Sequence, residues 1–546
     1  MFDIKIINGM VIDGIGDTRY RADIGITGDQ ITAIGNLADA PALETVDARG
    51  QVVCPGFVDV HTHSDMCLMY DHLGSSKIYD GVTTEVIGNC GIGVAPVSDD
   101  KKEQLITYLN TRLIGSLPVK LELPWNTMDE YLTALQACSP ATNVVPLVSH
   151  GAIRINEMGF ARGRPTEEQL SRMRHEVKKA MQTGCFGLSS GLMYMPGEYS
   201  DVDELGALSA EVSPYDSFYV SHIRSEGESI MEALDEAIAI AKKGNTALHV
   251  SHLKLAGSTV WGKTDEVFEK IYRARAQGLD VTFDVYPYAC GCTSLGTCMP
   301  PWTFEGGTAQ MLERIKDRAN RERIVREIKE GIHGWQNPIK TVGDWNRITL
   351  ATCYTKEGEA LLGRTIADIC QETHQDPFEF IFDFLIQENG RVQILAAMID
   401  QNDLDTIIAH PDAMIGSDGM NLSTVGVLSA GHPHPRTFGT HGHVLADYVR
   451  TRKIITLEDA VKKMTSKPAQ RMRLERRGTL QEGNYADVTV FDPDTVQDKA
   501  TYTEPKQYTQ GISTVIVNGQ FALRSGVQTG ITSCLLYTSP SPRDRG

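Results

Sequence analysis

The chain has 546 residues and a mass of 60.0 kDa, which is too long for a single small domain. Its hydrophobic content of 41% and charged content of 22% are ordinary for a soluble globular protein. The formal net charge of -18 repels phosphate backbones and anionic lipid surfaces, so we expect no nucleic-acid or membrane partner.

The cysteines and the N-terminal residues indicate the cellular compartment of the protein. The eleven cysteines show no disulfide-like spacing, and the start, MFDIKIINGMVIDG, lacks a basic stretch followed by an apolar one. No apolar run approaches the length that spans a bilayer. We therefore expect a cytoplasmic protein with reduced cysteines.

Both ends of the chain read as short β-strands. Residues 1–54 contain the runs FDIKII, MVIDG, ADIGITG and ITAIG, separated by Gly, Asn and Asp as in hairpins. Residues 478–524 return to this style with YADVTVFD and STVIVNGQFALR. We predict one small β domain built from residues 1–54 and 471–531.

Between the ends, residues 55–470 alternate apolar strand-like runs with helical stretches. The strand-like runs lie at 143–150, 184–190, 217–224, 246–254, 280–286 and 412–418, and helical patterns over 166–184, 226–244 and 264–278 separate several of them. Such alternation predicts a parallel α/β sheet. About eight units favour a (β/α)8 barrel, with a doubly wound sheet as the alternative. Residues 287–346 break the rhythm and are predicted to be an insertion.

Metal-binding side chains follow the predicted strands. His61 and His63 are two residues apart on one strand and therefore point to the same face. In a parallel barrel, chemistry sits at the carboxyl ends of the strands. The full set at these ends is His61, His63, Cys90, His222, His252 and Asp418.

Any one of these residues taken singly is best explained as a satisfied polar group or a small buried side chain. Their recurrence at one predicted barrel face favours a metal centre instead. Imidazole and thiolate suit zinc, and a carboxylate serves as ligand or proton carrier. A second histidine group, GHPHPRTFGTHGHVL at 431–445, contains prolines and glycines and is predicted to be a loop.

The ordered motifs resemble a known family. PGFVDVHTHSD, GVTTEVIGNCGIGVAP, SHIRSEGE, HVSHLK, DVYPY, GSDG, HPRTFGT and TSKPAQRMRLERRGTLQEGNYADVTVFD together are similar to the amidohydrolase superfamily. They resemble most its branch of N-acyl-D-amino-acid deacylases, the D-aminoacylases, over roughly residues 1–530. The resemblance implies a distorted (β/α)8 TIM barrel of the amidohydrolase type with a small β-sandwich formed from both chain ends.

The resemblance also implies roles for the site residues. Cys90, His222 and His252 would hold one tightly bound Zn²⁺, and His61 and His63 would line a second, weaker metal position with Cys90 as a bridge. Asp418 would be the catalytic acid/base. Hydantoinase- and dihydroorotase-like relatives usually bridge two metals with a carboxylated lysine. The corresponding stretch here, GCFGLSSGLMYMPG, contains no lysine, so Cys90 would supply the bridging anion.

The expected reaction is hydrolysis of an N-acyl-D-amino acid to a carboxylate and a D-amino acid, with metal-activated water as the nucleophile. The substrate is thus a small molecule, and its D-configuration rests on the resemblance alone. Its free carboxylate needs cationic or phenolic donors. For these contacts we expect Lys254, Tyr194, Arg436 and Tyr286.

Two further functions stay open. One is hydrolysis of cyclic amides, against which the missing lysine argues; the other is a non-catalytic scaffold on the same fold, which normally loses metal ligands. Residues 532–546, TSCLLYTSPSPRDRG, match neither the periodicity nor the family pattern. We interpret them as a foreign or disordered tail.

Overall fold

The computed structural model describes residues 1–113, 120–534 and 536. At the N-terminus, four strands form a sheet in the order β5-β4-β1-β6. They are β1 (Phe2–Ile7), β4 (Asp23–Thr27), β5 (Gln30–Gly35) and β6 (Ala42–Asp47). Ile4 and Ile6 of β1 and both isoleucines of β4 are buried, because these strands pack apolar side chains against the second sheet described next.

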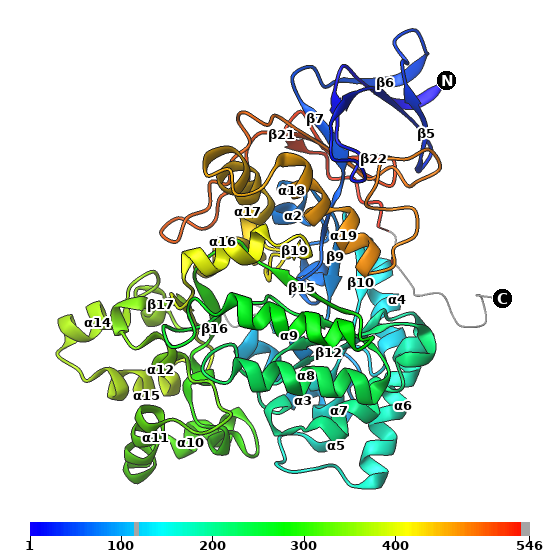
Figure 1. The fold of residues 1–546 in the computed structure, drawn as a ribbon. Helices are drawn as coiled ribbons and strands as arrows, with labels where there is room; N and C mark the ends of the chain where they lie inside the picture. Colours follow the sequence, from blue (N-terminus) through cyan, green and yellow to red (C-terminus); the bar gives the residue numbers. More distant parts are fainter. Residues whose placement is uncertain (114–119, 535, 537–546) are drawn as a thin grey trace.

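The second sheet joins the two ends of the chain (Figure 1). β7 (Val52–Pro55) pairs antiparallel with β20 (Val488–Phe491), with Val53 opposite Val490. β21 (Ile512–Val517), β22 (Gln520–Arg524) and β23 (Val527–Gln528) extend this sheet on one side, and β2 (Met10–Val11) and β3 (Tyr20–Arg21) extend it on the other. Strands from both ends of the chain therefore meet in this sheet, with β2, β3 and β7 from the N-terminal end and β20 to β23 from the C-terminal end.

The middle of the chain forms parallel strands in two sheets. β8 (Phe57–Asp59), β9 (Val82–Ile87) and β10 (Asn143–Pro146) form the first. The second contains β11 (Val148–Ser149), β12 (Gly187–Gly191), β13 (Phe218–His222), β14 (Ala247–Val250), β15 (Val281–Val285) and β19 (Ala413–Ile415). These strands are almost entirely buried, which explains why they read as continuous apolar runs.

Helices lie between these strands along the chain and pack against them. α6 (Glu167–Thr183) begins with a capping box between Thr166 and Gln169 and ends at Gly184, whose φ is 117°. α8 (Ile230–Gly244) and α9 (Thr264–Ala276) bury one apolar face each. α6 and α9 match their predicted ranges to within two residues, whereas α8 begins four residues later than predicted. The mixed α/β content expected from the alternating pattern is thus confirmed.

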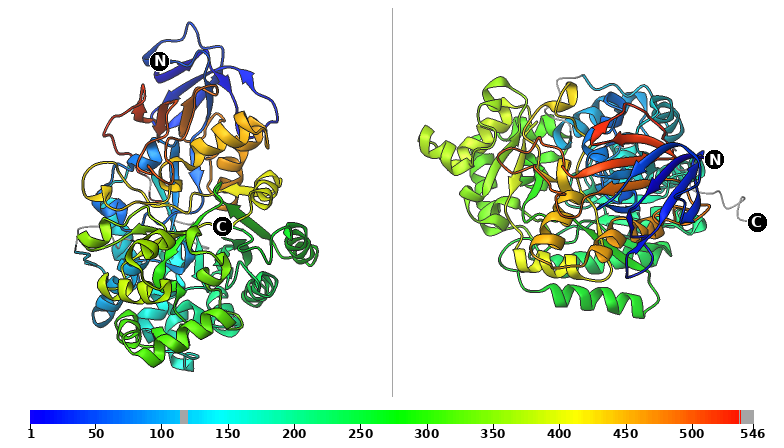
Figure 2. Two further views of the ribbon diagram at one scale, coloured as in Figure 1. Left: turned by 90° about the vertical axis from the view of Figure 1, so that its left-hand side faces the viewer. Right: turned by 90° about the horizontal axis from the view of Figure 1, so that it is seen from above.

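A long excursion separates β15 from β19, although these two strands are parallel neighbours. It contains an antiparallel sheet of β16 (Gly291–Ser294), β18 (Gln393–Ala396) and β17 (Ile348–Thr352). Its helices gather at one side of the molecule in Figures 1 and 2. They include α10 (Thr308–Arg314), α11 (Arg318–Glu330), α12 (Pro338–Val342), α14 (Ile366–Thr373) and α15 (Pro377–Gln387). The sheet joins β16, inside the expected insertion at 287–346, to two later strands.

A buried ion pair connects the first and last parallel strands. The Nζ atom of Lys77, on α2 (Ser75–Ile78), lies 2.8 Å from Oδ2 of Asp59 and donates to Oγ of Ser417 at 2.7 Å. The backbone N–H of Ser417 donates to Oδ1 of Asp59 at 2.8 Å. This network fixes the end of β8 relative to the segment after β19, and both segments lead into the candidate site.

No helix in the described part of the chain is long and apolar enough to cross a bilayer. Of the expected tail at 532–546, residues 535 and 537–546 lie outside the described residues. The described residues before them contact the body of the protein, since the Cys534 N–H donates to the Pro140 carbonyl at 3.1 Å. The predicted domain boundaries stay a prediction.

Replacement of Lys77 by Met tests the ion pair. In Lys77→Met the Asp59 carboxylate stays buried without its cation, which should cost about 3–5 kcal/mol of stability. We expect a clear fall in the urea midpoint, followed by circular dichroism. Lys316→Met is the control, because the Lys316 side chain is half exposed and its loss should change stability by less than about 0.5 kcal/mol. Equal midpoints for the two variants would contradict the structural role of Lys77.

Candidate metal centre

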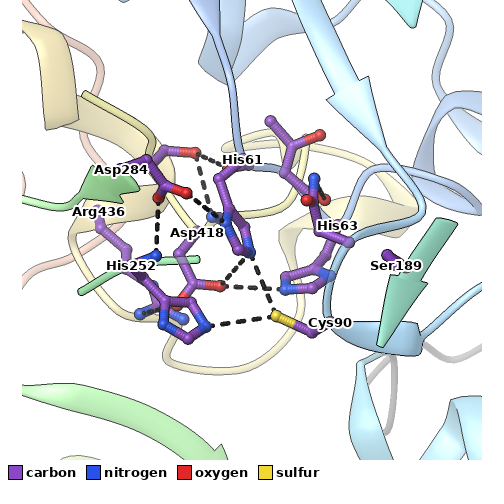
Figure 3. A network of polar contacts seen from close by, with 12 residues as sticks. His61, His63, Cys90, Ser189, His252, Asp284, Asp418 and Arg436 are labelled. Carbon is purple, nitrogen blue, oxygen red and sulfur yellow. Dashed lines mark hydrogen bonds and ion pairs between the residues drawn. The ribbon is translucent and has the colours of Figure 1, made fainter. Parts of the chain in front are cut away.

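The predicted metal-binding side chains meet at the carboxyl ends of the parallel strands (Figure 3). His61 and His63 follow β8, and Cys90 lies in the short helix η1 (Asn89–Gly91) after β9. His222 is the last residue of β13, and His252 follows β14 by two residues. Residues far apart in sequence are therefore neighbours because parallel strands end at one edge.

The sulfur of Cys90 is at the centre of the group. It lies 3.3 Å from Nε2 of His61 and 3.4 Å from Nε2 of His252. Asp418 adds a carboxylate whose Oδ1 is 3.0 Å from Nε2 of His63 and 3.5 Å from Nε2 of His61. Ligand atoms of His61, Cys90, His252 and Asp418 all lie within 4.8 Å of one another, close enough to share one ion.

His222 supplies a further reason to assign a metal here. Both of its ring nitrogens are buried and have no hydrogen-bond partner among the described residues. Its ring centroid is 4.4 Å from that of His252, and the two histidines form a second candidate ligand group with Glu226. A buried imidazole without a partner is unusual in a native fold. An ion held with Cys90 and His252 would occupy one of these nitrogens, so the residues present fit a metal.

Left-handed backbone conformations place three of the site residues. Cys90 has φ of 54°, His252 of 34° and Asp418 of 50°. This region is costly for residues with a side chain and is common at functional sites. The three conformations turn the chain sharply at strand ends, and the side chains project into the same space as a result.

The loop that carries Cys90 is held by very close packing. The Gly91 N–H donates to Oγ of Ser189 at 3.1 Å, and the hydroxyl of Ser149 donates to the Gly88 carbonyl at 2.8 Å. A Cβ atom on Gly191 would lie 2.1 Å from the carbonyl oxygen of Cys90. Only glycine therefore allows β12 to approach the Cys90 backbone this closely.

Charge in the site is balanced by its neighbours. Burial opposes ionisation of the Cys90 thiol, but the imidazoles of His61 and His252 outweigh it and hold the Cys90 pKa well below its usual range. Burial likewise opposes ionisation of Asp418. The guanidinium of Arg436, 2.7 Å from Oδ2, and the nearby imidazoles hold the Asp418 pKa well below its usual range. The site therefore offers a thiolate and a carboxylate.

Sequence reasoning missed Asp284, which orients two of the histidines. Its Oδ2 lies 3.3 Å from Nδ1 of His61, and its Oδ1 accepts the backbone N–H of His252 at 3.0 Å. With Nδ1 of His61 directed to Asp284, the Nε2 lone pair is available on the side of Cys90. The available signal was an acidic residue inside the apolar strand VTFDV.

Glu226 was also missed, and it changes the surroundings of Lys254. The Lys254 Nζ lies 2.5 Å from Oε1 of Glu226 and 2.8 Å from Nδ1 of His252. The same carboxylate oxygen is 2.9 Å from His252 Nδ1. Lys254 is thus engaged behind the histidine. Glu226 belongs to the motif SHIRSEGE, and its position four residues after the predicted ligand His222 was the signal that could have identified it.

A cavity opens above the metal-binding atoms and brings in two of the four expected substrate contacts. Tyr194 and Arg436 line it, together with His63, Cys90 and Asp418. Lys254 and Tyr286 do not line this cavity. Tyr286 lies beneath Arg436, whose guanidinium is 4.8 Å from the centre of its ring.

The second histidine group is only partly a loop. Residues 436–443 form α17 (Arg436–His443), so the loop prediction is wrong for this part. His441 pairs with Asp80 at 2.8 Å and His443 with Asp498 at 3.0 Å, while His434 hydrogen-bonds the Cys290 carbonyl at 2.9 Å. These histidines bind different partners rather than a common one, and the described residues place no ligand group there.

Comparison with known proteins connects this site with catalysis. The profile of the amidohydrolase family matches residues 44–327 and 346–522. The chain is 34% identical to an N-acyl-D-glutamate deacylase of Alcaligenes xylosoxydans xylosoxydans, over 95% of this chain and 93% of that protein. It is 33% identical to a D-aminoacylase of the same organism, over 95% and 94% of the two chains.

Solved structures give the same relationship. The N-acyl-D-glutamate deacylase of Bordetella bronchiseptica, complexed with zinc and a phosphonate that mimics the tetrahedral intermediate, superposes with a TM-score of 0.82 at 30% identity. The match covers 98% of this chain and 99% of that one. A D-hydantoinase from Thermus sp. shares the fold alone, with a TM-score of 0.54 at 15% identity.

Gly191→Ala tests the placement of Cys90. The added methyl group must displace the Cys90 carbonyl, so the affinity for zinc should fall about 10- to 100-fold, as for changes in the support of metal ligands. Zinc bound after competition with a chelator would be measured by mass spectrometry. Gly35→Ala is a matched control, because nothing lies within 4 Å of its added Cβ. Unchanged zinc affinity in Gly191→Ala would show that this packing does not position the cysteine.

Proposed function

The chain belongs to the amidohydrolase family, and we propose that it hydrolyses N-acyl-D-amino acids to a carboxylate and a free D-amino acid with the help of bound zinc. The observation that supports this most directly is the convergence of Cys90, His252 and His61 beside the ionised Asp418. The relatives at 33–34% identity are named for this type of reaction, and the similarity covers nearly their whole length.

For the metal, we assign Cys90, His222 and His252 to one tight Zn²⁺ position. His61 and His63 would line a second and weaker position, with the Cys90 thiolate shared between the two. Thiolate and imidazole are preferred zinc ligands. Zinc, when bound, supplies a Lewis acid and increases the acidity of water at the site.

Asp418 is the residue we assign to proton transfer. As an ionised carboxylate at the edge of the cavity it can accept a proton from the attacking water and deliver that proton to the leaving nitrogen. Arg436, paired with its Oδ2, keeps the carboxylate ionised and fixes its orientation, while His63 contacts the other oxygen. The amide nitrogen then leaves as a neutral amine, which removes the main obstacle to amide cleavage.

The α-carboxylate of the substrate would be held at the cavity wall by Arg436 and the phenol of Tyr194. Arg436 has five N–H donors and uses only part of them on Asp418. We retain Lys254 and Tyr286 as proposed contacts that require rearrangement, because Lys254 is paired with Glu226 and neither residue lines the cavity.

Of the other functions, cyclic-amide hydrolysis is less well supported. Residues 184–197, which include β12, contain no lysine that could carry a bridging carboxylate, and the likeness to a D-hydantoinase is limited to the fold. A non-catalytic scaffold does not explain why all six polar positions are retained and brought together. Bound metal after purification without added zinc would argue further against a scaffold.

The finer architecture is part of this proposal. We propose that the strands from β8 to β19 form a distorted (β/α)8 barrel, which the backbone bond from the Asp418 N–H to the His61 carbonyl, 2.8 Å long, would help to close. The two sheets at the chain ends would then be the small β-sandwich domain, since they share one hydrophobic cluster.

Amine release from matched N-acetyl-D- and N-acetyl-L-amino acids tests the function. The Met, Leu, Glu and Asp pairs should be incubated with protein whose zinc content has been measured. We expect release from the D series and at least about a hundredfold less from the L series, since a misplaced reacting group commonly costs that much. Absence of release from both series by zinc-loaded protein would refute the deacylase proposal.

Asp418→Asn tests the proton carrier. The variant should retain its zinc but lose about 10²–10⁴-fold in kcat, because the amide cannot take up the proton of the attacking water. Asp412→Asn is a matched control at the opposite end of β19, where Asp412 pairs with Arg275 on the surface. A near-normal kcat in Asp418→Asn would exclude the assigned role.

A further inference from the structure

We propose that Arg112 forms an anion-binding subsite for a second carboxylate of the substrate, which makes N-acyl-D-amino acids with an acidic side chain the preferred substrates. The inference rests on the proposed function and adds a substrate class to it. The sequence offered no signal for Arg112, because the residue lies in a polar helical stretch far from every motif.

Arg112 is buried and held firmly. It is the last residue of α3 (Lys102–Arg112), and only 7% of its surface is exposed. Its Nη1 donates to Oγ1 of Thr297 at 2.6 Å, and its guanidinium lies 4.9 Å from the ring centre of Tyr194. The Gln393 side chain donates to its backbone carbonyl at 2.7 Å. These contacts orient the guanidinium before a ligand binds.

Arg112 has no acidic partner in the described part of the chain. The other strongly buried arginines there are ion-paired, as Arg154 is with Glu204, Arg436 with Asp418, and Arg471 with Asp280. Burial lowers the pKa of Arg112, and the groups that oppose this are the phenols of Tyr108 and Tyr194. The adjoining sequence 114–119, IGSLPV, contains no acidic residue. A buried cation without an anion is costly, which points to an anion supplied from outside.

The position of Arg112 suits a second carboxylate. Arg112 lines the same cavity as Cys90, Asp418 and Tyr194, and so does Arg436. Thr293 and Ser294, from β16, line this cavity as well. The α-carboxylate is assigned to Arg436, so Arg112 offers a second cationic fork in the same cavity. A substrate with two carboxylates would engage both arginines.

The test compares N-acetyl-D-glutamate with N-acetyl-D-glutamine, which differ in charge but hardly in shape. The unmodified enzyme should have the higher kcat/KM for the glutamate. In Arg112→Met the ratio of the two kcat/KM values should fall about 10- to 100-fold, the usual effect of losing a charge-assisted hydrogen bond. Arg112→Lys should retain part of the ratio. Arg318→Met, which removes an arginine that is 92% exposed, should leave the ratio unchanged.

A second substrate pair shows whether Arg112 binds a carboxylate on the amino-acid side chain or one on the acyl group. N-succinyl-D-alanine carries its extra carboxylate on the acyl group, and N-butanoyl-D-alanine lacks it. We expect Arg112→Met to change the ratio for this pair by less than about threefold. A large change here, with none for the glutamate pair, would overturn the side-chain assignment and place the second carboxylate on the acyl group.

Binding to Asp418→Asn separates failure of the subsite from failure of the proposed function. Calorimetry on Asp418→Asn should show tighter binding of N-acetyl-D-glutamate than of N-acetyl-D-glutamine. In the double variant Asp418→Asn/Arg112→Met the two ligands should bind with equal affinity. Turnover of N-acetyl-D-methionine without any glutamate preference would refute the subsite and leave the function intact. A preference in binding, without turnover of any D-substrate by the unmodified enzyme, would support the subsite and refute the function.

Discussion

The arrangement of the site depends on burying one charged sulfur. The Cys90 thiolate lies inside the protein, where an unpaired charge is strongly unfavourable, and the imidazoles of His61 and His252 at 3.3 and 3.4 Å compensate it. The same electrostatic attraction would hold a cation. These contacts hold the imidazoles and the sulfur close together, in an arrangement that suits a shared cation.

The supporting residues explain how this geometry is maintained. Asp284 orients His61 and anchors the backbone of His252, and Gly191 lets β12 reach the Cys90 loop. Left-handed backbone at Cys90, His252 and Asp418 costs stability, and it persists because buried packing and hydrogen bonds leave no alternative. The packing of the parallel sheets therefore offsets the cost of these conformations and keeps the reacting groups in place.

Much of the fold and part of the site were predictable. The strand runs, three long helices and the meeting of both chain ends follow from apolar periodicity, which acts over a few residues. The six polar residues at strand ends were predictable because parallel strands end at one edge. Asp284 was missed because an acidic residue inside a strand gives no partner by itself. The helix at 436–443 was missed because the glycines and prolines of this stretch favour a loop. The contacts that stabilise the helix come from residues distant in sequence, such as Asp80.

By itself the sequence determined which donor types exist and in what order they follow the strands, because local pattern decides where each strand ends. Only the tertiary structure decided how charges are paired. Arg471 meets Asp280 across 191 positions, Arg436 meets Asp418, and Arg112 meets no described carboxylate. Ion pairing falls off over a few ångströms, whereas spacing along the chain says little about distance between remote segments. For this reason the substrate-facing cations became distinguishable only in three dimensions.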